Sequence, residues 1–230
     1  MDRNFKRAFS LVLKHEGGWS DHPDDPGGAT MKGVTLATFR RYVKPNGTKA
    51  DLRNITDEQL ATVYRRHYWD AVHGAELPNG VDFALFDFAV NSGPARAAKF
   101  LQAVVGVTQD GRIGPATLKA VRAKMHATVI HDLCDKRMAF LKGLETWPTF
   151  KHGWTRRVTD VRVEALNMAA PARPLDNGKF NQAVDDLVND TPAAGARKEL
   201  GLGREPIPSG NWFARLIEAL ANILTKWSIK

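Results

Sequence analysis

Apolar residues recur at steps of three and four through most of the first 170 residues, and this periodicity constrains the fold more than any other feature. Such spacing gives each segment one apolar stripe, as in helices that pack around a common core. Alternating apolar and polar runs, which would indicate strands, are sparse. The sequence therefore predicts a mainly α fold.

Glycine, proline and capping residues divide this pattern into separate helices. Thr56 and Gln59 have the spacing of a capping box, and Pro115 lies where the first residue of a helix is expected. Residues 19–33 contain too many Gly, Pro and Asp residues for a helix, and residues 29–34 favour a short β-hairpin. We expect helices over residues 5–13, 36–43, 56–73, 81–90, 95–105, 115–133 and 154–168.

The composition changes after Ala170, where the chain becomes rich in Pro, Gly, Ala and Asp. Its last segment, residues 211–227, has an amphipathic stripe that includes Trp212 and Trp227. Two hypotheses account for this stripe. Its apolar face packs on the rest of the protein, or it contacts an anionic membrane surface or a partner.

The formal net charge of +8 favours polyanionic partners such as nucleic acid, an anionic membrane or the bacterial wall. The basic residues are dispersed and no zinc-finger or RNA-binding signature is present, so we expect no nucleic-acid partner. The single cysteine, Cys134, excludes an intramolecular disulfide. Because it falls in an apolar helical stretch, we expect a buried side chain.

The start of the chain lacks the apolar core and the cleavage site of a signal peptide. No stretch reaches the roughly 18 apolar residues of a membrane span. We therefore expect synthesis in the cytoplasm, and release by another route if the target lies outside.

Glu16 continues the apolar face of the first predicted helix, because it follows Leu13 by three residues and Val12 by four. Partial desolvation and the negative end of the helix dipole both favour a protonated carboxyl there. Protonation of a glycosidic oxygen requires such an acid. Gly17 and Gly18 leave room for a substrate to approach. The alternative is a surface glutamate at a frayed helix end.

Several motifs, in the same order, resemble those of the glycoside hydrolase family 108 muramidases over about residues 5–168. Their number and order make the resemblance more specific than a single Glu-Gly-Gly motif. The motifs are EGGW at residues 16–19, DDPGGAT at 24–30, GVT at 33–35, YRRHYWD at 64–70, FDFAVNSG at 86–93, LQ at 101–102, DGRIGPAT at 110–117 and GW at 153–154.

The resemblance implies a lysozyme-like helical domain with a small β-hairpin, merged with a helical peptidoglycan-binding region. The lysozyme-like catalytic domain would span residues 1–92 and the peptidoglycan-binding domain residues 93–170, which leaves residues 171–230 as an extension. The implied activity is that of an endolysin-like, bacteriolytic muramidase. It would hydrolyse the β-1,4 bond between N-acetylmuramic acid and N-acetylglucosamine in the cell wall without a cofactor, and we expect a monomer.

In that family the glutamate of the Glu-Gly-Gly motif is the catalytic acid, which here is Glu16. Eight residues separate Glu16 from Asp25 and four separate Asp25 from Thr30. This resembles the Glu, Asp and Thr arrangement of T-even phage lysozymes, in which one more residue precedes the Thr. Asp25 would stabilise the oxocarbenium-like state or aim a water, unless it is only a turn residue, and Asp21 and Asp24 compete for this role. Thr30 either orients the water or bonds a nearby backbone group.

Three further residues are candidates for substrate binding. Asn91 would contact an N-acetyl sugar or cap the turn after its helix. Tyr68 and Trp69 would line the cleft, because aromatic faces pack on sugar rings, or else belong to the core. Asp87 interrupts an apolar helix, and since a buried acid needs partners, we expect a structural acceptor there.

Two other functions compete with glycoside hydrolysis. A zinc-dependent amidase or peptidase has little support, because the seven histidines form neither an HExxH motif nor a Cys/His cluster. A non-catalytic peptidoglycan-binding or secretion-accessory protein on a lysozyme-like fold is the second alternative. The intact motif at residues 16–18 and the presence of Asp25 argue against it.

Overall fold

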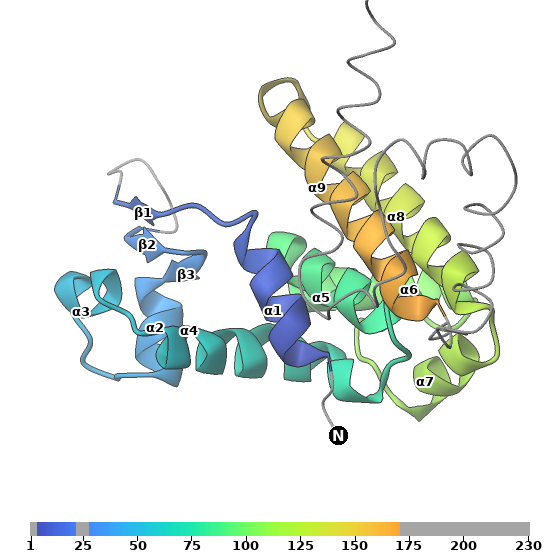
Figure 1. Cartoon of the computed structure of the whole chain (residues 1–230), viewed down its shortest axis with the longest axis horizontal. Coiled ribbons are helices and arrows are strands. Elements are labelled where there is room, and N and C mark those ends of the chain that lie inside the picture. The colour runs from blue at the N-terminus through green and yellow to red at the C-terminus, as the bar shows by residue number, and fades with distance from the viewer. Residues whose placement is uncertain (1–3, 22–27, 171–230) are drawn as a thin grey trace, which may run out of the picture. The chain divides into compact units, whose positions relative to one another are not determined.

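A computed structural model of the chain describes residues 4–21 and 28–170. Residues 1–3, 22–27 and 171–230 lie outside the described part, and with them the predicted amphipathic segment at residues 211–227. The described residues belong to one compact unit, in which helices predominate and three short strands form a small sheet (Figure 1). The predicted mainly α, lysozyme-like class is confirmed.

The first helix, α1 (Phe5–Leu13), leads into the antiparallel sheet, whose strands are ordered as in the sequence. Met31 pairs with Trp19 on one side and with Val34 on the other. The hairpin predicted at residues 29–34 is confirmed, and the first strand adds an edge that the sequence analysis did not predict. The strands are β1 (Trp19–Ser20), β2 (Thr30–Met31) and β3 (Val34–Thr35).

Threonine side chains cap the beginnings of several of the remaining helices. The Thr35 side chain accepts a hydrogen bond from the Thr38 amide, and Thr56 with Gln59 forms the predicted capping box. A π-helical turn, Arg65–Trp69, prolongs the helix that follows Thr56. The helices are α2 (Leu36–Tyr42), α3 (Lys49–Arg53), α4 (Asp57–Tyr64), α5 (Val81–Ser92), α6 (Pro94–Val105), α7 (Pro115–Arg122), α8 (His126–Lys142) and α9 (Trp147–Ala169).

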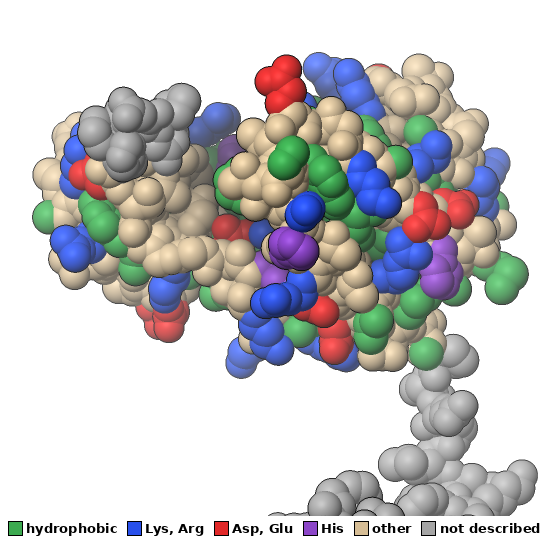
Figure 2. Space-filling view, turned by 90° about the horizontal axis from the view of Figure 1, so that it is seen from above, with side chains coloured by type: hydrophobic (Ala, Val, Ile, Leu, Met, Phe, Trp, Pro, Cys, Tyr) green, Lys and Arg blue, Asp and Glu red, His purple; other side chains and the backbone are tan. Residues whose placement is uncertain are grey.

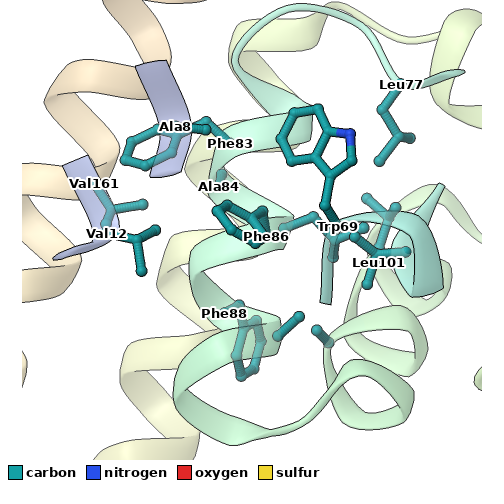
Figure 3. Packing of buried hydrophobic residues seen from close by; sticks show 14 of the residues in the cluster. Ala8, Val12, Trp69, Leu77, Phe83, Ala84, Phe86, Phe88, Leu101 and Val161 are labelled. Carbon is teal, nitrogen blue, oxygen red and sulfur yellow. The ribbon is translucent and has the colours of Figure 1, made fainter. Parts of the chain in front are cut away.

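Helix α5 is buried along most of its length and forms the centre of the core, as its continuous apolar sequence predicts. Val12 and Val161 pack beside it from α1 and α9, while Trp69 and Leu101 lie toward its other side (Figure 3). Cys134 is buried as predicted, and burial raises the pKa of its thiol to about 11. Elements on both sides of the predicted domain boundary at residues 92–93 therefore share one core, and that boundary stays a prediction.

The arrangement of the elements leaves a hollow within this unit. The sheet lies with α2 and α3 at one end, and α6, α8 and α9 lie at the other (Figure 1). From above, the surface between these two parts is hollowed, with acidic side-chain atoms inside (Figure 2). Within the described ranges, no helix has the length and apolar character needed to cross a bilayer.

The single helix predicted over residues 115–133 is wrong. The structure has α7 and α8 there, because the backbone is extended at Met125, the residue before α8. Its side chain is 76% exposed instead of lying on an apolar stripe. The break lets α8 pack against α5, α6 and α9. Helix α9 also begins earlier than predicted, at Trp147, and the short helix α3 was not predicted.

We predict that Gly80→Ala destabilises the protein by about 1–3 kcal/mol more than Gly93→Ala. Both glycines have a positive φ, +83° and +90°, so each substitution carries backbone strain. A Cβ at Gly80 would lie 2.1 Å from the Ala165 carbonyl oxygen of α9, whereas nothing lies within 4 Å of one at Gly93. Urea unfolding measures the difference. Equal losses would contradict the close approach of the start of α5 to α9.

Candidate active site

Glu16 lies one turn beyond the end of α1, and its amide still donates to the Leu13 carbonyl at 3.3 Å. Its side chain is only 15% exposed. One carboxylate oxygen, Oε1, accepts a hydrogen bond from Arg157 Nη1 of α9 at 2.9 Å. The alternative of a surface glutamate at a frayed helix end is therefore wrong, because the carboxyl is largely buried and held by a side chain 141 residues away.

The turn of the β2–β3 hairpin lies against the other carboxylate oxygen. A Cβ placed on Gly33 would be 2.7 Å from Glu16 Oε2 and 2.7 Å from the Tyr64 hydroxyl. The φ of Gly33 is +74°, a region that glycine adopts without strain. The Tyr64 hydroxyl fixes the turn by donating to the Lys32 carbonyl at 2.8 Å. Glycine at position 33 therefore allows the hairpin and the acid to approach each other.

A buried group of charges connects Glu16 to the centre of the fold. Asp87 of α5 is fully buried and accepts hydrogen bonds from Arg157 Nε at 3.0 and 3.1 Å. Arg137 of α8 donates from Nη1 to Asp87 at 2.7 Å and from Nη2 to Asn91 Oδ1 at 3.1 Å. Asp87 is thus a structural acceptor, in agreement with its predicted role. We call Glu16, Arg157, Asp87, Arg137 and Asn91 the arginine network.

Within the arginine network, the neighbouring opposite charges shift the pKa values in the direction opposite to the effect of burial. Burial alone would raise the pKa of Asp87, but the two guanidinium groups outweigh it and hold this pKa below its ordinary value. Burial alone would lower the pKa of Arg157, but Asp87 and then Glu16 raise it. Glu16 is thus largely buried, as its spacing predicts, and in addition has a charged partner in Arg157 that the sequence did not indicate.

Two tyrosine rings lie beside the acid. Burial and then the charge of Glu16 raise the pKa of the Tyr68 hydroxyl to about 12, and the same two effects raise the pKa of Tyr64 further. Tyr68 is half-buried, with its ring 5.5 Å from that of Tyr64 and 4.5 Å from that of His67. The structure thus brings the predicted binding residue Tyr68 near Glu16, with its hydroxyl protonated at neutral pH.

Trp69 does not line a cleft. It is 1% exposed and packs edge-on against Phe5 and Phe86, with ring centroids at 5.5 and 5.3 Å. Its indole N–H has no hydrogen-bond partner among the described residues. The candidate role of Trp69 in substrate binding is wrong, because the π-helical turn directs its side chain into the core.

The other predicted residues have local partners. The Thr30 hydroxyl on β2 donates to the Gly28 carbonyl at 3.0 Å, which is the backbone contact that the sequence analysis gave as an alternative. The exposed Asp21 forms an ion pair with Lys49 at 2.9 Å. Asp25, the candidate second carboxylate, and Asp24 lie outside the described residues.

The sequence analysis missed both arginines of the arginine network. A partial signal was present, because a buried acid at Asp87 requires partners, and Arg137 and Arg157 lie in helices that are otherwise apolar on one side. No pattern in the chain indicates which of the 33 basic residues would supply them. Within the described ranges, no group of three or more His, Cys, Asp and Glu side chains could hold a metal ion.

Two protein families match the two parts of the chain that contribute residues to this site. The sequence model of the glycosyl hydrolase 108 family matches residues 9–93, and that of a predicted peptidoglycan domain matches residues 96–159. The solved structure of Brucella abortus SagA is 48% identical in sequence, with a TM-score of 0.68, and the match covers 75% of this chain and 99% of that chain. No curated protein sequence matches the chain. Glu16 falls in the first family match, whereas Arg137 and Arg157 fall in the second.

We predict that the protein loses stability as the pH falls below about 4 and that Asp87→Asn removes part of this loss. The folded-state pKa of Asp87 is lowered, so its contribution is complete above the unfolded pKa and is lost as the pH falls through the folded one. Asp87→Asn should also cost about 3–5 kcal/mol at neutral pH, because it takes the carboxylate partner from the buried Arg137 and leaves Arg157 paired with Glu16 alone. Chemical denaturation between pH 3 and 7 measures both effects. An Asp87→Asn protein as stable as the wild type at pH 7 would contradict the network.

Proposed function

This chain belongs to the glycosyl hydrolase 108 family and is a peptidoglycan hydrolase, and we propose that it cleaves the β-1,4 bond between N-acetylmuramic acid and N-acetylglucosamine as a lysozyme does. Glu16 is the general acid that protonates the glycosidic oxygen. The observation that carries this proposal is the position of Glu16, a largely buried carboxyl held at one oxygen by Arg157.

Arg157 positions the acid. Its hydrogen bond to Oε1 leaves Oε2 beside Gly33, which comes this close because it has no side chain. A sugar bound at the exposed part of the carboxyl displaces water from it. Glu16 then gives its proton to the leaving oxygen as the glycosidic bond breaks.

The second carboxyl group of the reaction is Asp25, on the spacing of the sequence. As the resemblance implies, Asp25 would stabilise the oxocarbenium-like state or direct a water. Thr30 can assist because its hydroxyl oxygen still has acceptor capacity while it donates to Gly28. Tyr68, near Glu16, and Asn91, at the end of α5, are proposed contacts for the sugars.

The site of action would be the bacterial cell wall, where this polymer is found. A net charge of +8 draws the protein to that anionic surface. We propose that it acts there as a monomer after release from the cytoplasm, as an endolysin does.

We predict that Glu16→Gln lowers the rate of glycan cleavage by about 10²–10⁴-fold, the usual contribution of a general acid. The amide retains the size of the side chain but has no proton of suitable acidity. Reducing ends released from purified peptidoglycan measure the rate, and mass spectrometry of the fragments identifies the bond. Glu164→Gln is the matched control, because it removes a carboxyl that only pairs with Arg7 at the surface.

Three results would contradict the proposal in different ways. Undiminished cleavage by Glu16→Gln would show that Glu16 is not the general acid. Fragments cut at amide bonds would show that the protein does not cleave the glycosidic bond. Wild-type protein that binds sacculi and releases no reducing ends would favour the peptidoglycan-binding accessory protein instead.

A further inference from the structure

Helix α9 begins well before the residue that holds Glu16. Arg157 lies ten positions after Trp147, a distance of about 15 Å along a helix. Trp147, Phe150 and Trp154 precede Arg157 at steps of three and four, so all four side chains lie toward the same side of α9. We call the first three residues the aromatic stripe.

This side of α9 is covered along its second half and open at its beginning. Val158 and Val161 are buried where α9 packs on α5 and α8. Near its start α9 extends beyond the end of α5 (Figure 1), and Phe150 is 50% exposed, one of few large apolar side chains so exposed among the described residues. The side of α9 that packs on the core in its second half is therefore accessible to solvent near its beginning, before Arg157.

The three rings pack together, with Phe150 exposed and both tryptophans half-buried against the core. Phe150 and Trp154 have ring centroids 5.3 Å apart with 32° between their planes. Trp147 and Trp154 are 6.2 Å apart with 34° between theirs. Rings inclined so little present their faces in similar directions. The apolar C–H face of a pyranose ring packs on such a surface, while its hydroxyl groups remain in water.

The charged residues between Trp147 and Arg157 are basic. From Trp147 to Arg157 the chain has the exposed residues Lys151, His152 and Arg156, and no acidic residue. Peptidoglycan carries carboxylates on its peptides, so this charge suits a strand of that polymer. Lys151, four residues after Trp147, borders the stripe, whereas Arg156 lies toward the side of the helix that carries Val163. The surface therefore combines an apolar strip for sugar rings with one cation beside it.

We propose that the aromatic stripe is a glycan subsite, on which a sugar of the peptidoglycan strand packs beyond the bond that is cleaved. The proposal rests on the proposed function, because it takes Glu16 as the point of cleavage. A strand bound at Glu16 reaches the stripe by following α9 past Arg157. A second copy of the chain is a poorer occupant, because a stable interface needs about 800 Å² from each partner and three side chains of one helix supply much less.

Binding and cleavage together test the subsite. In a Glu16→Gln background, Phe150→Ala should weaken binding to purified glycan strands about threefold to tenfold, the effect of one lost aromatic contact. With Glu16 intact, Phe150→Ala should lower kcat/KM on long strands by a similar factor and leave cleavage of the shortest cleavable fragments unchanged. Val163→Ala is the matched control, since Val163 is 52% exposed on another side of the same helix.

Several outcomes would overturn the subsite without touching the proposed function. Equal losses for Phe150→Ala and Val163→Ala would do so, as would a loss that does not depend on strand length. A dimer in sedimentation that becomes a monomer on Phe150→Ala, with strand binding unchanged, would assign the stripe to a second copy. If wild-type protein cleaves neither long nor short glycans while Phe150→Ala still weakens strand binding, the proposed function fails and the subsite stands.

Discussion

The guanidinium group of Arg157 lies between two carboxyl groups, Glu16 at the end of α1 and Asp87 at the centre of α5. It is largely buried, and a buried cation is costly unless it is paired. Asp87 supplies that pairing and is itself neutralised by Arg137. The position of Glu16 therefore depends on charges deep in the fold and not on the end of α1 alone.

This dependence joins the two family regions of the chain. Glu16, Gly33 and Tyr64 belong to the region of the glycosyl hydrolase match, whereas Arg137 and Arg157 belong to that of the peptidoglycan-domain match. The second region thus does more than offer a surface to the wall, because it holds the Glu16 carboxyl, which is the proposed acid. If the aromatic stripe holds a sugar, α9 both fixes the proton donor and guides the strand toward it.

Local features of the fold could be predicted, because they depend on neighbouring residues. The capping residues Thr35 and Thr56, the hairpin at residues 29–34 and the buried helix α5 all follow from short patterns. Glu16 was found by its spacing and its motif. The break at Met125 was missed, because apolar periodicity continues through a position where the chain changes direction.

Such short patterns could not predict contacts between residues that lie far apart in the sequence. The bond between Glu16 and Arg157 joins residues 141 positions apart, and only the packing of α9 on α5 brings them together. Trp69 shows the same limit, because an aromatic residue suits a sugar site and a core equally well until its neighbours are known.

A crystal structure of the Glu16→Gln protein with a bound glycan strand tests the central claim most directly. We expect the bridging oxygen within about 3 Å of the residue 16 side chain, on the side that faces Gly33, with Arg157 still bridging residue 16 and Asp87. A strand whose glycosidic oxygens all lie away from residue 16, or an Arg157 side chain turned away from it, would contradict the account.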